Sequence, residues 1–198
     1  MKNPWTNILA AIIWVAPIIY LLTVYSSLPE IVPLHYNMEG EPDAVGKKSE
    51  LIVIQIVISF MSGGVYLLIK NGIGTNGEEK QEYSPATLNK LAMGILVFMS
   101  VICIAIALDT VYESFSGTTI FFPASGLLLA FIGSSIQDVK PTHKFTGRLW
   151  LISGITLAIV VLFLPALLTR IVFGLFIITV IVIPLIYSYR YNKKQLKE

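Results

Sequence analysis

Long stretches without any formal charge recur six times along this sequence. They cover Asn3–Pro29, Leu51–Ile69, Leu91–Leu108, Ser114–Gln137, Leu149–Thr169 and Ile171–Tyr189. A helix needs about 20 apolar residues to cross the hydrocarbon core of a bilayer, so each stretch is long enough for one span. Only Arg170 separates the last two, and Pro165 together with Arg170 predicts a tight turn there. We therefore expect an all-α, polytopic integral membrane protein with six transmembrane helices.

The composition agrees with a membrane protein and argues against other classes. Hydrophobic residues make up 55% and charged residues 13% of the chain, far from the average of soluble domains. The net charge of +2 is too small to predict direct nucleic-acid binding. The sequence contains no HExxH, GxSxG or phosphate-loop motif. We predict that the protein is not an enzyme and needs no cofactor.

The positions of lysine and arginine predict how the chain crosses the membrane. Cytoplasmic loops of membrane proteins carry an excess of these residues. With six spans, eleven of the fourteen fall on the side of both termini, and the other side receives Lys47, Lys48 and Arg170. The N and C termini are therefore expected in the cytoplasm, and the protein is expected in the cell (plasma) membrane. The bilayer is its first expected partner.

A polar segment, Leu28–Lys48, separates the first two stretches and would face the outside. It reads LPEIVPLHYNMEGEPDAVGKK, with turn-forming residues and both signs of charge. Ile31, Val32, Leu34 and Tyr36 are expected to form an apolar underside that docks on the outer ends of the helices. We predict an ordered extracellular loop over residues 28–50, with its acidic tip exposed.

Three side chains of this loop recur every four residues and suggest a metal site. His35, Glu39 and Asp43 would share one face of a helix. However, Pro33, Gly40 and Pro42 would interrupt a helix here. We therefore favour a structured turn with solvated charges and predict no metal.

No ionisable residue lies near the middle of a predicted span. Asp109 comes at the outer end of the third stretch and is expected at the interface. Ionisable residues inside a membrane usually mark function, so their absence argues against an ion pump. Gln55, Ser59 and Ser62 either line a path for a solute or mark close contacts between helices.

A second polar segment, Gln137–Arg148, is expected in the cytoplasm. Its basic residues would contact anionic headgroups, or it would form a docking face for a cytoplasmic protein with Trp150 as an interfacial anchor. The candidate docking residues are Lys140, Pro141, Lys144, Gly147, Arg148 and Trp150.

The loop motif resembles a known domain. Leu28-Pro29, Pro33-Leu34-His35-Tyr36, Gly40-Glu41-Pro42-Asp43 and Gly46-Lys47-Lys48 are similar in order and spacing to the signature of the domain of unknown function DUF1648. This domain is typically found at the N terminus of proteins similar to the SdpI-type immunity and signalling family of bacterial membrane proteins. That family carries a cytoplasmic KPN…GIRTPWT…W motif. Here Lys140-Pro141, Gly147, Arg148 and Trp150 form a shortened version, Thr142 replaces the asparagine, and the PWT element is absent.

The resemblance and the polarity pattern together predict three parts of the chain. Residues 1–70 would form the DUF1648-like module of two spans and the extracellular loop. Residues 71–89, rich in glycine and charge, would form a cytoplasmic linker, and residues 90–198 a four-span, weakly SdpI-like module. Ser84 before Pro85 predicts the start of the third helix.

The family resemblance implies an immunity or receptor-like protein that recognises an extracellular peptide or toxin and signals to a cytoplasmic repressor. The alternatives are a small transporter or permease component and a structural membrane partner. The candidate recognition residues are Pro29, Pro33, His35, Tyr36, Glu39, Gly40, Glu41, Pro42, Asp43 and Lys47.

Overall fold

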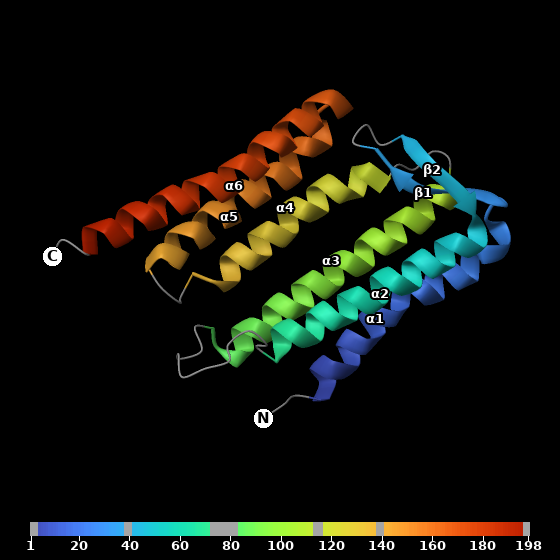
Figure 1. Ribbon diagram of the computed structural model, residues 1–198, viewed down its shortest axis with the longest axis horizontal. Coiled ribbons are helices and arrows are strands. Elements are labelled where there is room, and N and C mark those ends of the chain that lie inside the picture. The colour runs from blue at the N-terminus through green and yellow to red at the C-terminus, as the bar shows by residue number, and fades with distance from the viewer. Residues whose placement is uncertain (1–3, 38–40, 72–82, 113–116, 138–140, 196–198) are drawn as a thin grey trace. The chain divides into compact units, whose positions relative to one another are not determined.

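The computed structural model describes residues 4–37, 41–71, 83–112, 117–137 and 141–195. The helices are α1 (Pro4–Val24), α2 (Lys48–Lys70), α3 (Pro85–Val111), α4 (Gly117–Ser135), α5 (Pro141–Val160) and α6 (Ala166–Gln195), with short 3-10 turns at η1 (Tyr25–Ser27) and η2 (Val161–Phe163). Two strands, β1 (Ile31–Tyr36) and β2 (Pro42–Lys47), lie between α1 and α2. The chain divides into two compact units, one holding residues 1–76 and 88–121 and the other residues 77–87 and 122–198 (Figure 1).

The described helices are those of a multi-pass membrane protein. Five of them, α1, α2, α3, α5 and α6, are long and apolar enough to cross a bilayer, and Thr119–Ser135 of α4 is a shorter apolar helix. Large apolar side chains on these helices are exposed, among them Phe60 at 76% and Ile152 at 67%. A surface of this kind is stable in lipid and is not found on a soluble monomer.

In the first unit, α1, α2 and α3 pack side by side (Figure 1). One buried cluster, Leu21, Leu28, Val32, Leu51 and Ala107, joins all three helices to the strands. A second cluster, Ala10, Tyr66, Ala92 and Leu96, joins the other ends of the same helices. The third span therefore belongs to the same compact unit as the first two, whereas the sequence grouped it with the C-terminal module.

Polar side chains tie the three helices together inside the bilayer region. The Trp14 indole nitrogen donates to the carbonyl oxygen of Ser59 at 2.6 Å, and the Gln55 amide donates to that of Cys103 at 2.8 Å. The Ser100 hydroxyl donates to the carbonyl oxygen of Ile13 at 2.8 Å. Such bonds satisfy polar groups that water cannot reach. Gln55 thus lies at a close contact between helices, which is one of the two interpretations that the sequence left open.

The second unit depends on glycines at the contact of α4 and α5. A Cβ atom on Gly126 would lie 2.6 Å from the carbonyl oxygen of Gly154, and one on Gly133 would lie 2.5 Å from that of Gly147. Only residues without a side chain allow the two backbones to approach this closely. Between α5 and α6, the Trp150 indole nitrogen donates to the carbonyl oxygen of Val180 at 2.9 Å.

Two local predictions have different outcomes. The Ser84 hydroxyl accepts a hydrogen bond from the backbone N–H of Thr87 at 3.1 Å, which is the predicted cap, and α3 begins at Pro85 inside the predicted linker 71–89. Residues 72–82 lie outside the described part. The predicted turn is confirmed at Pro165, which lies in the break between η2 and the start of α6 at Ala166, and is wrong at Arg170. Arg170 lies inside α6 and its Nε donates to the carbonyl oxygen of Ala166 at 3.2 Å.

Candidate functional site

The polar loop between α1 and α2 folds as an antiparallel β-hairpin (Figure 1). The pairing runs from Ile31 opposite Lys47 to Tyr36 opposite Pro42, with irregularities on either side of His35. The sequence predicted an ordered turn but no strands, so this hairpin is an addition to the expected all-α fold. Pro33 lies within β1. Its missing backbone N–H is tolerated because β1 is an edge strand.

An ion pair closes the base of the hairpin. Lys48 Nζ lies 2.8 Å from Glu30 Oε1, and the Lys48 backbone N–H donates to the carbonyl oxygen of Glu30 at 3.1 Å. The same ammonium lies over the Tyr25 ring, 5.1 Å from its centroid. The Lys48 side chain is 18% exposed and that of Glu30 is 85% exposed. These contacts fix where the chain leaves α1 and enters α2.

The underside of the hairpin is apolar and docks on the helix ends, as predicted for Val32 and Leu34, whereas the prediction is wrong for Ile31, which is 57% exposed. Val32 is fully buried and Leu28 nearly so, and Leu34 packs on the same cluster. Gly46 allows this close fit because a Cβ atom there would collide with Leu34 and Glu50. Burial of this kind contributes about 25 cal/mol for each Å² of apolar surface removed from water.

A second attachment joins the far end of β1 to the end of α3. The Tyr36 hydroxyl hydrogen-bonds with the Asp109 carboxylate, and the side chain is half-buried. Burial, followed by the Asp109 hydrogen bond and charge, raises the pKa of Tyr36 above its ordinary value of 10.0, while a hydrogen bond with Thr110 acts in the opposite direction. Tyr36 therefore attaches the far end of β1 to α3. Asp109, expected only at the interface, is its partner.

The outer face of the hairpin carries a histidine–carboxylate pair. His35 Nδ1 and Asp43 Oδ1 lie 2.6 Å apart, and their side chains are 70% and 45% exposed. Near the tip, Asn37 and Glu41 exchange bonds, since the Asn37 N–H donates to the Glu41 carbonyl and the Glu41 N–H donates to the Asn37 side-chain oxygen, both at 2.9 Å. These contacts hold the two strands in register. Among described residues no group of three or more His, Cys, Asp or Glu side chains could hold a metal ion.

The candidate recognition residues of the hairpin differ in their exposure. Exposed on the hairpin or its base are Pro29, His35, Glu41, Pro42, Asp43 and Lys47. Pro33 and Tyr36 are partly buried, and Glu39 and Gly40 lie outside the described residues. Of the carboxylates and ammonium groups among these residues, those of Glu41, Asp43 and Lys47 are exposed, and Asp43 is paired with His35.

The second candidate segment is helical and not a loop. Pro141 begins α5, and Lys144, Gly147, Arg148 and Trp150 follow within it, whereas Lys140 lies outside the described residues. Lys144 and Arg148, one turn apart, are exposed, but Gly147 is buried against α4. Trp150 is bonded to α6 and does not stand free as an interfacial anchor. Two of the predicted docking residues thus serve the packing of the second unit.

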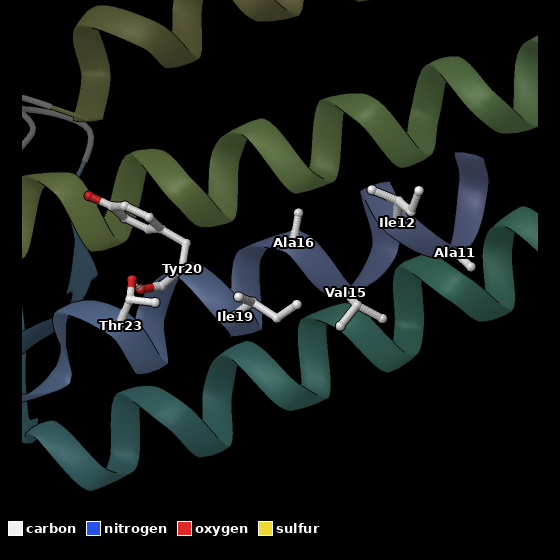
Figure 2. A pocket seen from close by; sticks show the side chains of 7 residues that line it. All are labelled: Ala11, Ile12, Val15, Ala16, Ile19, Tyr20 and Thr23. Atoms are coloured by element: carbon white, nitrogen blue, oxygen red, sulfur yellow. Dashed lines mark hydrogen bonds between the residues drawn. The ribbon is translucent and has the colours of Figure 1, made fainter. Parts of the chain in front are cut away.

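The described surface of α1 is hollowed along one face. A hollow of about 590 Å³ follows this face between Ala11 and Thr23, with mostly apolar walls (Figure 2). Its Thr23 hydroxyl already donates to the Tyr20 carbonyl at 2.6 Å. The Tyr20 and Thr23 hydroxyls are the only side-chain polar groups among the residues that line it, and so apolar a wall along one helix is typical of a surface that faces lipid.

The hairpin across the ends of a three-helix unit defines the class, a multi-pass membrane protein with an ordered cap on its first two spans. Residues 12–59 match the domain of unknown function DUF1648, which covers most of α1, the whole hairpin and the first half of α2. The resemblance stated from the loop motif is therefore confirmed for this domain.

A relative of similar sequence carries little further information. An uncharacterized protein of Archaeoglobus fulgidus is 37% identical over 65 residues, which are 32% of this chain and 33% of the relative. The match thus spans about a third of the relative's length. No solved structure matches the chain.

Proposed function

We propose that the protein is a membrane receptor whose hairpin recognises an extended, cationic peptide outside the cell. The observation that carries the proposal is an ordered hairpin, fixed to helix ends by Lys48, Val32 and Tyr36, that turns its acidic residues outward. A recognition surface that is already ordered loses little entropy when a ligand binds. This is the role that a receptor or immunity protein of the SdpI type would need.

Strand β2 supplies the geometry for an extended ligand. It is paired on one side only, and its residues Asp43, Ala44 and Val45 are exposed. An edge strand offers unpaired backbone groups to which a further strand can be added. Glu41 and Asp43 beside this edge favour a ligand that carries lysine or arginine.

The buried polar residues favour recognition over transport. Within the first unit, the Gln55 amide, the Ser62 hydroxyl and the Ser100 hydroxyl each donate to a backbone carbonyl. These bonds use the side chains for contacts within and between helices, which favours a packing role over a path for a solute, although the Gln55 side-chain oxygen is buried without a hydrogen-bond partner among the described residues. The signal to a cytoplasmic regulator would pass through Lys144 and Arg148, because both side chains are exposed.

Peptide binding to the purified protein tests the proposal. The probe is a 12-residue lysine-rich peptide designed to be extended, compared with a version in which glutamate replaces each lysine. We expect the lysine peptide alone to bind, with an association rate that falls with added salt. Glu41→Gln combined with Asp43→Asn should slow association by about tenfold, because neutral side chains no longer attract the peptide.

The control is Lys47→Gln on the same strand, which should leave binding unchanged or strengthen it. A lysine peptide whose backbone nitrogens are methylated at alternate residues should bind more weakly, since it cannot pair with β2. Equal binding of both charge versions, or rates that do not depend on salt, would contradict the proposal.

A further inference from the structure

A groove of about 470 Å³ lies between α1 and α2, at the end of the first unit where α1 begins and α2 ends. Its walls are mainly apolar and include Phe60, Leu67 and Leu96. Polar groups gather at one end only, where Asn7 and Lys70 lie. An apolar body with a few polar groups that fix orientation is the usual form of a small-molecule site.

Lys70 gives this end of the groove a positive charge. Its ammonium donates to the Asn7 side-chain oxygen and to the Tyr66 hydroxyl at 3.1 Å, and it lies 5.1 Å from the centroid of the Tyr66 ring. These partners are neutral. The described ion pairs are His35 with Asp43 and Lys48 with Glu30, so within the described part of the chain no carboxylate neutralises Lys70.

Two adjacent glycines shape the groove in different ways. A Cβ atom on Gly63 would lie 2.8 Å from the Trp14 indole nitrogen, so this glycine is required for the packing of α1 on α2. A Cβ atom on Gly64 would meet nothing within 4 Å. Trp14 is itself held by its bond to the Ser59 carbonyl. The groove is therefore open at Gly64 beside a wall that cannot move easily.

The direction of the groove matches a lipid. From Asn7 to Trp14 it follows α1 for about 10 Å at 1.5 Å per residue, from the polar end of the helix into its apolar part. Lys70 is the last residue of α2, the position from which a lysine reaches the headgroup layer. We propose that this groove binds an anionic phospholipid, with one acyl chain along Gly64 and the phosphate accepting hydrogen bonds from Lys70 and Asn7.

Native mass spectrometry of the full chain released from mixed vesicles tests this site. The vesicles contain equal amounts of phosphatidylglycerol and phosphatidylcholine with the same acyl chains. We expect bound phosphatidylglycerol to exceed phosphatidylcholine by about fivefold, as one lysine at an anionic lipid gives. Lys70→Gln should remove the preference, and Gly64→Leu should reduce the binding of both lipids because its side chain fills the groove.

Matched variants separate the site from general effects. Lys90→Gln removes the same charge from the exposed start of α3, and Gly174→Leu adds the same side chain at a glycine of α6 where a Cβ atom also meets nothing within 4 Å. Both should retain lipid as the unaltered protein does. Circular dichroism checks that Gly64→Leu is folded, and Gly64→Ala replaces it if it is not.

Three results would overturn the proposal: equal retention of the two lipids, equal losses in the control variants, or full competition by water-soluble glycerol phosphate. The last result would show that the acyl chain does not contribute. Peptide binding at the hairpin should be unchanged in Lys70→Gln, so the two proposals can fail separately.

Discussion

At the scale of single residues, Tyr36 shows how a motif residue can have a structural role. Its hydroxyl bonds to Asp109, a residue more than seventy positions away in the sequence. A hydrogen bond to a charged group contributes about 1.5–3 kcal/mol, and partial exposure of Tyr36 reduces this. The bond therefore fixes the end of β1 on α3.

Stability should consequently decrease at alkaline pH in a way that depends on Tyr36. The pKa of Tyr36 is raised in the folded protein, so its contribution to stability is fully present below the ordinary value of 10.0 and is lost as the pH rises through the folded pKa. Thermal unfolding of the unaltered protein and of Tyr36→Phe, measured from pH 8 upward, checks this. The stability difference between them should shrink above pH 10.

The control for this measurement is Tyr112→Phe, which changes a tyrosine that is 53% exposed. Its stability should follow that of the unaltered protein at every pH. A difference for Tyr36→Phe that stays constant at high pH would show that the Asp109 bond does not hold the hairpin.

At the scale of elements, glycines decide how α4 and α5 pack. Gly126 and Gly133 on α4 face Gly154 and Gly147 on α5, so the contact repeats after seven residues along both helices. Where backbones approach this closely, an added methyl group meets a carbonyl group or an amide and not a flexible side chain. The helices would have to move apart.

The same substitution should therefore have opposite effects at two glycines. Gly154→Ala places a Cβ atom 2.7 Å from the Ala130 nitrogen and should destabilise the protein by about 1–3 kcal/mol. Gly174→Ala meets nothing within 4 Å and should stabilise it by about 0.5–1 kcal/mol, because alanine favours the helix. Denaturant titration in detergent measures both values. Equal effects at the two positions would refute the close packing of α4 on α5.

At the scale of the whole molecule, the number of crossings depends on α4. Its apolar part, Thr119–Ser135, is 17 residues long by its bounds, or about 26 Å at 1.5 Å per residue, whereas the hydrocarbon core is about 30 Å thick. If α4 crosses, the hairpin and the end of α6 face opposite sides. If it does not, they face the same side.

Labelling of single cysteines in intact cells tests the predicted six spans and cytoplasmic termini. In a Cys103→Ala background, which removes the only native cysteine, Ala44→Cys on β2 should react with a membrane-impermeant maleimide from outside. Gln195→Cys at the end of α6 should react only after the cells are opened. Labelling of both from outside would show that α4 does not cross.

The hairpin could be predicted only in part. Its order, its apolar underside and its exposed acidic residues follow from Val32, Leu34 and the prolines, because these are local properties of the chain. The pairing of His35 with Asp43 could not be predicted, because it requires the register of two strands. The four-residue spacing that brings side chains together on a helix does not apply in a hairpin. A histidine and an aspartate on either side of a predicted turn are the pattern that could have indicated this pair.

The sequence by itself determined that the chain is a multi-pass membrane protein, since the length and polarity of its segments favour their transfer into lipid. It also determined the cap at Ser84 and the match to a known domain. Only the tertiary structure decided that α3 joins the first two helices, that Asp109 receives Tyr36, and that Gly147 and Trp150 serve packing in the second unit. Those outcomes depend on contacts between residues distant in sequence, where shape and hydrogen bonding select among many apolar surfaces that look alike in the sequence.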